Sequence, residues 1–455
     1  MRKLNRLVID CQQSAISSRQ IVGCRYQLLR RRNLFFRLTV SLLWINLYFG
    51  KVEAQNWKLY LTNELQATYG YYFQNLENSN RTIPELNSRH ELQARYKTNF
   101  TAFASLHSIV NQHEKDRRRL WLNEAYVAFN KGSFYGKLGK QIVKWGTLTG
   151  LSALDLANVY DYYDFIRTDR EALGIWGADF KLNLKKFQFQ LKVAPFDNIS
   201  RLYFQQHRWI RLPNQLPRPD GTLLPVAFSG LQKTAFSGIT YGASIGIENE
   251  GSDLKMGWYS GQNDIPQYHT VLGGDMTDQG IPYEIALTYH PLNIGAVSFT
   301  KLLGDFSAWT EVSFIQNQRM LEGQLMPDNY FGLTIGLDRL FLFENPEKQL
   351  KFLLQYLKNF TDAQPAYAVN DIDHVLDHAL LLDLNFQFNY VWKASLRSVL
   401  NLSDTSHYFS TGIDYKMTDK FSWNVHLDLL YGNQQHFFGY YRDNTRIFLT
   451  LNYQL

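Results

Sequence analysis

The nine residues from Leu382 to Tyr390 read Leu-Asp-Leu-Asn-Phe-Gln-Phe-Asn-Tyr. Apolar side chains alternate strictly with polar ones. Only an extended strand places alternate side chains on opposite faces, so this stretch separates an apolar environment from an aqueous one. The pattern returns in at least a dozen other segments, and no helical domain is present to cover their apolar faces. We therefore predict an all-β protein, a closed antiparallel transmembrane β-barrel that is apolar outside and polar inside.

Candidate strands occur throughout Gln55–Leu455, and the last one alternates up to the carboxyl terminus. At roughly 9–11 residues per transmembrane strand, this length suits a barrel of about 16–18 strands with a water-filled lumen. The eighteen candidates are 57–73, 89–106, 121–130, 133–143, 173–183, 186–196, 236–249, 252–261, 282–290, 294–302, 306–316, 330–342, 349–360, 378–390, 394–403, 407–417, 421–431 and 445–455.

Residues 1–54 have the features of a leader with a secretory signal peptide. A positive region at Arg30–Arg37 precedes an apolar run from Leu38 to Gly50, and Val52-Glu53-Ala54 suits cleavage before Gln55. The thirteen apolar residues are fewer than the roughly 20 that a spanning helix needs. We expect an over-extended start codon to account for residues 1–29, and 55–455 to form the barrel.

The net charge of +6 belongs to the leader. Residues 1–54 hold ten basic and two acidic residues, a balance of +8, which leaves about −2 for the remainder. The basic balance therefore gives no support for nucleic acid as a partner. Both cysteines, Cys11 and Cys24, also lie in the leader, so the exported chain would have no disulfide, thiolate metal site or cysteine nucleophile.

Several short motifs lie between Leu120 and Arg211, and they are Leu122–Tyr126, Gly136–Gly146, Asp155–Asn158, Asp169–Trp176 and Pro195-Phe196. Their order resembles that of a poorly characterised family of porin-like outer-membrane β-barrels of Gram-negative bacteria. Lys140 stands where that family usually has Arg, and the Pro expected after Asp155 is absent. The resemblance implies an outer-membrane channel or export role, and it supplies no catalytic residue.

Two other patterns have ordinary explanations. Gly242-Ala243-Ser244-Ile245-Gly246 matches a nucleophile elbow, but it lies inside an alternating run with no following helix, as small residues of a barrel strand do. The polar segment Asp371–His378 could hold a divalent cation, but it has no EF-hand spacing and is more typical of an acidic loop. We predict no metal site and no cofactor.

The connection Trp145–Glu171 carries five acids and two arginines, and Ser152 could cap a short helix. It is either an ordinary surface loop or a segment folded into the lumen, where it would select solutes by charge and size. Alternation predicts eight inward acids, including Glu284, Glu311, Asp414 and Asp428, and six inward bases, a near balance. The lumen or constriction candidates are Glu64, Glu124, Asp155, Asp161, Asp164, Arg167, Arg170, Asp179, Lys192, Asp383 and Arg397.

The sequence predicts a channel for small polar solutes in the outer membrane of a Gram-negative bacterium, in contact with membrane lipid. An alternative is the exit barrel of an export system for lipid or polymer, with periplasmic partners, which an apolar track in the lumen would favour. A barrel with a plugged lumen is a third reading. We predict no enzyme, because an enzyme would need Ser, His and Asp converging at one rim and the sequence shows no such set.

Overall fold

A computed structural model describes Lys51–Leu455 apart from several gaps, and it divides the chain into two compact units, Met1–Ala54 and Gln55–Leu455. In the first unit it describes only the short strand β1 (Lys51–Ala54). The gaps are 55, 75, 77–79, 114–116, 146–147, 149, 165–170, 196–199, 202–207, 210–214, 218–222, 226, 229–238, 266, 273–282, 322–323 and 362–373.

Apart from β1, eighteen strands form one sheet in which each strand pairs antiparallel with its neighbours. They are β2 (Trp57–Tyr72), β3 (Thr82–Tyr96), β4 (Phe100–Asn111), β5 (Arg119–Lys131), β6 (Phe134–Gln141), β7 (Ile175–Leu184), β8 (Phe187–Ala194), β12 (Thr240–Asn249), β13 (Ser252–Gln262), β16 (Pro291–Leu303), β17 (Phe306–Leu321), β18 (Gln324–Leu342), β19 (Gln349–Phe360), β20 (His378–Gln387), β21 (Trp392–Asn401), β22 (His407–Lys416), β23 (Phe421–Tyr431) and β24 (Arg446–Gln454).

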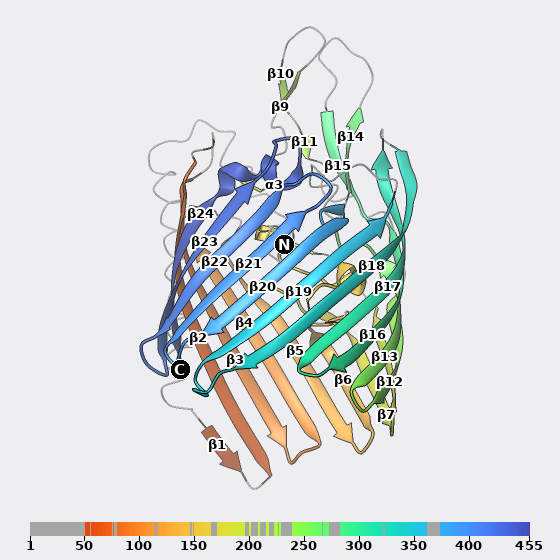
Figure 1. The fold of residues 1–455 in the computed structure, drawn as a ribbon, viewed down its shortest axis with the longest axis vertical. Helices are drawn as coiled ribbons and strands as arrows, with labels where there is room; N and C mark the ends of the chain where they lie inside the picture. Colours follow the sequence, from red (N-terminus) through yellow and green to blue (C-terminus); the bar gives the residue numbers. More distant parts are fainter. Residues whose placement is uncertain are drawn as a thin grey trace, which may run out of the picture. The chain divides into compact units, whose positions relative to one another are not determined.

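The sheet closes on itself because β2 pairs with β3 on one side and with β24 on the other (Figure 1). At the seam, the Gln66 side chain donates to Asn452 Oδ1 at 3.0 Å. Closure leaves no unpaired sheet edge, which is what lets a β-structure cross a bilayer. The predicted closed antiparallel barrel of about 16–18 strands is thus confirmed, with eighteen.

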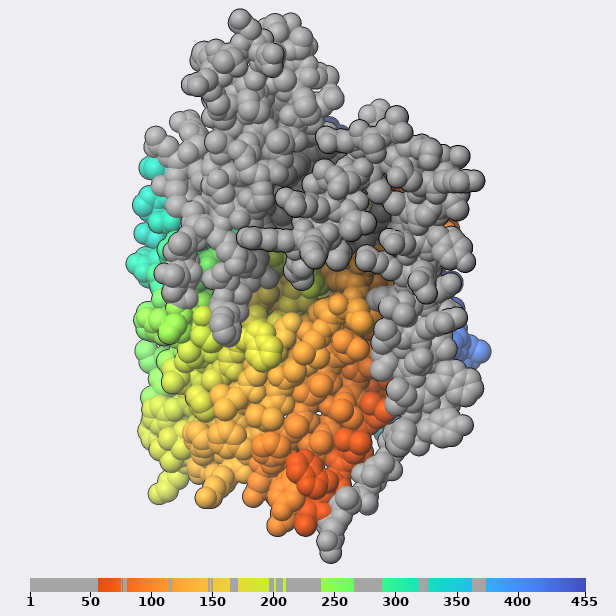
Figure 2. All heavy atoms as spheres, turned by 180° about the vertical axis from the view of Figure 1, so that it is seen from behind, coloured from red at the N-terminus to blue at the C-terminus, as the bar shows by residue number. Residues whose placement is uncertain are grey.

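Alternation divides the wall into two faces. On β24, the outward residues Ile447, Leu449 and Leu451 are between 37% and 44% exposed, while the alternate residues Arg446, Phe448 and Thr450 are buried. The outward face is therefore apolar, and the lumen face carries most of the polar side chains. Figure 2 shows part of this outer wall, formed by the strands near the amino-terminal end of the barrel.

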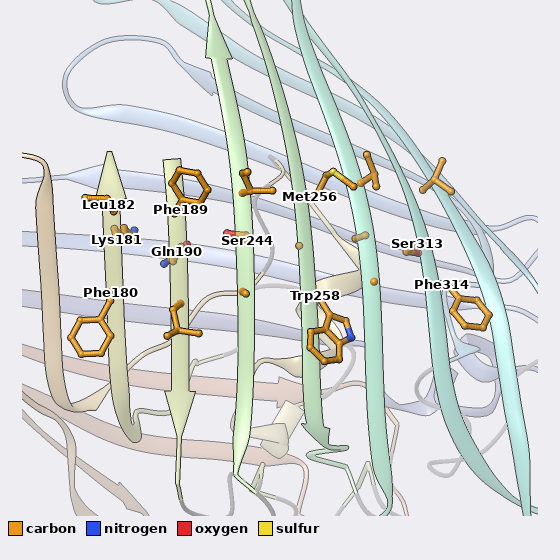
Figure 3. Close-up of a pocket in the computed structure, with 18 of the residues that line it drawn as sticks. Phe180, Lys181, Leu182, Phe189, Gln190, Ser244, Met256, Trp258, Ser313 and Phe314 are labelled. Carbon is orange, nitrogen blue, oxygen red and sulfur yellow. The ribbon is translucent and has the colours of Figure 1, made fainter. Parts of the chain in front are cut away.

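The outer wall carries an apolar groove of about 730 Å³ across β7, β8, β12, β13, β16 and β17. Figure 3 shows Phe180, Trp258 and Phe314 standing along it. Ala243 and Gly295 lie in the same cross-strand row as Trp258, and their small size makes the depression. The groove is part of the apolar exterior.

The number of predicted strands agrees with the structure, but two assignments were wrong. The candidate 89–106 covers the end of β3 and the start of β4, which a turn at Lys97-Thr98-Asn99 separates, with Lys97 at φ 51°. The candidate 282–290 holds β15 (Tyr283–Thr288), which belongs to a separate sheet. The prediction that Glu284 is an inward residue of the barrel wall was therefore wrong, because Glu284 lies on β15. Alternation identifies a two-faced strand but not the sheet that it joins.

The remaining elements are short. β15 pairs with β14 (Gln267–Leu272) and with β11 (Ala227–Phe228), and β9 (Gln215–Pro217) pairs with β10 (Leu223–Pro225). The short helical turns are η1 (Ala153–Ala157), η2 (Tyr162–Asp164), α3 (Phe437–Tyr440) and η4 (Arg442–Asn444). Within the described residues, no helix combines the length and the apolar content needed to cross a bilayer.

Candidate channel constriction

The segment between β6 and β7, residues 142–174, contacts the inner wall of the barrel through its described residues, and we call it the infolded segment. Its helix η1 begins at Ser152, and Ser152 and Asp155 form a reciprocal capping box. The Ser152 hydroxyl lies 2.8 and 3.1 Å from the two carboxylate oxygens of Glu311, and the Ala153 N–H donates to the same group at 2.8 Å. Glu311 is a buried inward residue of β17, so it fixes the start of η1 to the wall.

A second anchor joins the segment to β19. The Leu151 N–H donates to Gln355 Oε1 at 2.9 Å, and Gln355 Nε2 donates to the Leu151 carbonyl at 2.5 Å. One amide side chain therefore satisfies both backbone groups of Leu151. Burial raises the pKa of Asp155 nearby, and the hydrogen bonds from Ser152 and Asn158 offset part of this effect.

Apolar contacts hold the same segment against β12 and β13. The Trp145 ring meets Tyr259 edge-on at 4.9 Å, and Leu154 is buried in the same cluster. A Cβ on Gly242 would lie 2.1 Å from the Trp145 ring, so only glycine lets the indole approach this strand. Gly242 of the Gly242–Gly246 motif thus serves packing, and the whole motif lies within the barrel strand β12, as predicted.

The other end of the segment is held by charge. Asp161 forms an ion pair with Arg119 of β5 and lies 3.5 Å from Arg201. Glu171 Oε1 accepts a hydrogen bond from His107 Nδ1 of β4 at 2.7 Å. The segment therefore crosses from β6 to contacts on β17 and β19, then returns to β5 and β4.

A β-bulge in β5 places Asn123 where it bonds to Ala172 and Gly174 at the end of the infolded segment. The β4–β5 register shifts between Ser105 and Leu106, which leaves Asn123 as the extra residue. Asn123 accepts from the Gly174 N–H at 3.1 Å and donates to the Ala172 carbonyl. Lys140, outward by its parity with Leu138, donates to the Leu122 carbonyl beside the bulge at 2.6 Å.

Two polar cavities lie between the infolded segment and the strands β2 to β4, β23 and β24, and we call the two cavities together the passage. Their volumes are about 340 and 400 Å³, and both are lined by Gln66, Asn87, Arg117 and Glu171. Arg117 forms a bidentate ion pair with Glu85 and stacks over the Tyr163 ring at 3.4 Å. Acids and bases thus face each other along this side of the lumen.

Apolar side chains form a cluster inside the barrel, against β17 and β19 to β22. Its members on wall strands, all buried inward residues, include Trp309, Leu353, Leu381, Val399 and Tyr408. From the connections, Tyr162, Trp209, Ile265, Phe437, Phe438 and Tyr441 join them. A cavity of about 340 Å³ lies between this cluster and η1. The described interior therefore combines apolar packing with polar contacts, since Glu311 and Gln355 lie on the same strands as Trp309 and Leu353.

A second connection reaches across the interior to the seam. Arg208 follows β8, yet it donates to Asn444 Oδ1 at 3.1 Å and to the carbonyls of Gln74 and Asp443 at 2.9 and 3.0 Å. Asn444 Nδ2 donates back to the Arg208 carbonyl at 3.1 Å. These bonds tie the segment after β8 to the connections beside β2 and β24.

The acidic segment before β20 is held to β18 by His374. Its two ring nitrogens lie 2.7 Å from Asp328 and 2.7 Å from Asp377. Burial lowers the pKa of His374, but these two bonds and charges outweigh it and raise the pKa to about 10. The ring is therefore charged at neutral pH and keeps no lone pair for a cation. Asp371 and Asp373 lie outside the described residues.

The predicted site residues fall into three groups. Asp155 and Asp161 lie on the infolded segment, whereas the side chain of Asp164 and all of Arg167 and Arg170 lie outside the described residues. The others lie on inward positions of wall strands: Glu64 lines a polar cavity, Glu124 accepts from the Ile142 N–H, Asp179 accepts from Gln190, Lys192 donates to the Lys144 carbonyl, and Asp383 pairs with Arg397.

Sequence reasoning missed four of the residues that shape the passage: Glu85, His107, Arg117 and Gln355. Glu85 was missed because β3 begins at Thr82, whereas the predicted strand 89–106 begins seven residues later. The parity of Gln355 within β19 could have identified it as inward. Nothing in the local sequence could have identified Arg117, which lies in a connection.

No protein-family model matches the chain, and no curated protein sequence matches it. Solved structures resemble it in fold. A loop-deletion mutant of OmpT, an outer-membrane protein of Vibrio cholerae, is 8% identical with a TM-score of 0.42, over 88% of this chain and 100% of that one. Salmonella typhi OmpF in complex with daunomycin is 9% identical with a TM-score of 0.44, over 89% and 100%.

Proposed function

We propose that this chain is a channel for small polar solutes in the outer membrane of a Gram-negative bacterium. A closed barrel with an apolar exterior is an architecture that spans such membranes. The observation that carries the proposal is the pair of polar cavities beside the infolded segment, which share four lining residues. Single-channel recording of the purified protein in a planar bilayer tests it, and a barrel that passes no ions would contradict it.

The proposed mechanism requires no chemistry. Polar side chains along β2, β3 and β24 replace part of the solute's hydration, and the infolded segment sets the size limit. The charged groups at the passage are paired, Glu85 with Arg117 and Asp161 with Arg119. Paired charges present both signs to a solute, so strong selection for one sign of ion is not expected.

Removal of one member of a pair should create selectivity. In Glu85→Gln, the guanidinium of Arg117 keeps its positive charge while the carboxylate that neutralises it is removed. One charge about 4 Å from an ion in water is worth about 1 kcal/mol, or about a fivefold preference for anions. The reversal potential in a salt gradient measures this preference. Asp305→Asn is the matched control, because Asp305 pairs with Arg339 away from both cavities. Equal shifts in both variants would place Arg117 outside the conduction path.

The leader is a further part of the proposal. The arginine-rich flank, the short apolar run and Val52-Glu53-Ala54 predict a mature protein that begins at Gln55. Mass spectrometry of the amino terminus, on protein taken from native membranes, measures the cleavage site. Membrane-inserted protein that retains residues before Lys51 would contradict the assignment.

An exit barrel for lipid or polymer is a second candidate. The apolar cluster and its cavity of about 340 Å³ favour it, because an apolar chain could lie along this side of the interior. The backbone pairing of the wall is continuous around the barrel, so lateral release would need strands to part. Block of the conductance by an added fatty acid, without block by a sugar, would favour this candidate.

A further inference from the structure

Four polar side chains meet on the outer wall at β2, β3 and β4. Asn63 is directly opposite His90, and Ser88 is directly opposite Ser108. Asn63 shares the outward face of β2 with Tyr69, which is 54% exposed, and Ser88 and His90 share the outward face of β3 with Leu86 and Leu92. A polar cluster on the face that meets hydrocarbon is costly, and such residues mark functional sites.

The four side chains form one chain of hydrogen bonds. Ser88 Oγ lies 3.1 Å from His90 Nε2, and His90 Nδ1 lies 2.7 Å from Asn63 Oδ1. The Ser108 hydroxyl lies 2.6 Å from Ser88 Oγ. One assignment of protons satisfies every group: Ser108 donates to Ser88, Ser88 to Nε2, and Nδ1–H to the amide oxygen of Asn63.

This order of groups is that of an activated serine. A hydroxyl bonded to one imidazole nitrogen, with the other nitrogen held by a third polar group, is the arrangement that lets histidine take the serine proton. Asn63 fixes the ring as the tautomer whose Nε2 can accept. Ser88 and His90 are two positions apart on β3, whereas Asn63 lies on β2, 27 positions before His90, so no single local motif contains all three residues.

The surroundings indicate the chemistry of the substrate. The Asn63 backbone pairs with Leu455 at the chain end, and the outward Tyr453 is opposite Leu65, so the cluster lies beside an aromatic ring of the kind found at membrane interfaces. The polar cavity of about 400 Å³ is lined by Ser88 and Ser108 as well as by inward residues. Lipid esters would lie on one side of this wall and water on the other.

We propose that Ser88, His90 and Asn63 form an acyl-transfer site for the ester groups of membrane lipids. Ser88 Oγ attacks the ester carbonyl carbon while His90 takes its proton, and His90 returns that proton to the departing alcohol. Water then attacks the acyl-serine ester in the same way, which releases the fatty acid and restores the serine. Asn63 is a positioning residue that orients His90.

Access to Ser88 depends on its neighbours. Asn63, Ser88, His90 and Ser108 are all buried, whereas Leu86 and Leu92 on the same face are 37% and 43% exposed. An ester that reaches Ser88 Oγ must therefore move neighbouring side chains of the outer wall. The two exposed leucines on the same face would contact the apolar chain of such a substrate.

A similar set faces the lumen. Ser105 Oγ lies 2.8 Å from His107 Nε2, and His107 Nδ1 lies 2.7 Å from Glu171. Ser105 is 1% exposed and lines neither of the two polar cavities, so no solute in them reaches its hydroxyl. Ser105 and His107 therefore anchor the infolded segment through Glu171, and Ser105 is an internal control for the labelling of Ser88.

The test is covalent labelling of the folded, detergent-solubilised full chain with a long-chain alkyl fluorophosphonate. Mass spectrometry of the digest should find the adduct on Ser88. Ser88→Ala should abolish it, and His90→Ala should slow it by about 10²-fold or more. Asn63→Ala should also slow it, while Asn63→Asp should retain it. Ser398, an outward serine of β21 opposite Leu382, is the matched control, and its alanine variant should label normally.

Release of fatty acid from phospholipid in mixed micelles is the second measurement, and Ser88→Ala should lose it. Labelling at Ser105 instead of Ser88, or unchanged labelling in His90→Ala, would overturn the proposal, as would a folded barrel that takes no label. The inference rests on the proposed membrane location but not on conduction. His90→Ala should keep the conductance of the parent, because His90 lines neither polar cavity, so failure of the channel and failure of the acyl-transfer site can be told apart.

Discussion

Replacing Ser152–Asp164 with a short Gly/Ser linker should raise single-channel conductance and loosen size exclusion. The replaced residues contain the anchors to Glu311 through Ser152 and Ala153, together with Leu154, which packs beside Gly257. Their removal joins the polar cavities to the space that η1 occupies. Conductance should rise roughly twofold or more, since current grows with the open cross-section of a pore.

Two controls make this experiment decisive. A Gly/Ser replacement of Glu344–Lys348, the turn between β18 and β19, should leave conductance unchanged, because none of its residues lines either polar cavity. Glu311→Gln should give an intermediate effect, because the amide loses one of the two acceptor oxygens beside Ser152. Conductance that stays at the parent value in a stably folded linker variant would place the segment outside the conduction path.

Much of the fold could be predicted from alternation alone. The repeat of two in β20 and β24 defined which side chains face outward, and it needed no knowledge of distant contacts. Alternation failed at Lys97, where a three-residue turn interrupts two strands that are both rich in polar residues. It failed again at β15, which alternates but pairs outside the wall.

The candidate site was less predictable because its contacts join residues far apart in sequence. Ser152 and Glu311 are 159 positions apart, and Leu151 and Gln355 are 204 apart. The dense mixture of charge in Trp145–Glu171 was compatible with a surface loop as well as with a segment folded into the lumen, and it could not identify the strands that such a segment contacts. The Ser88–His90–Asn63 set was not predicted for a different reason: an enzyme was expected to need Asp beside Ser and His at one rim, whereas here Asn63 of β2 lies opposite His90 of β3.

The outward face of the barrel should reject charge where the lumen face accepts it. Phe386 and Leu382 both face outward on β20. Phe386 packs against Phe343 and Phe388 near the end of the strand. Leu382 lies in the middle of the strand, opposite Leu354, and is therefore closer to the centre of the bilayer. Arginine at the bilayer midplane costs about 2–4 kcal/mol, against about 0–1 near the interface.

We therefore expect Leu382→Arg to lower the free energy of unfolding by about 2–4 kcal/mol and Phe386→Arg to lower it by about 1 kcal/mol or less. Asn385→Arg is the lumen-facing control on the same strand, because Asn385 is exposed inside the barrel and donates to Asp383 at 2.6 Å. Its arginine would meet a carboxylate and water instead of hydrocarbon, so it should fold normally and change only conductance. Urea-induced unfolding in lipid vesicles, followed by heat-modifiability on gels, measures all three variants. Equal losses of stability in Leu382→Arg and Asn385→Arg would mean that the two faces of β20 are assigned wrongly, and with them the polar lumen on which the proposed channel depends.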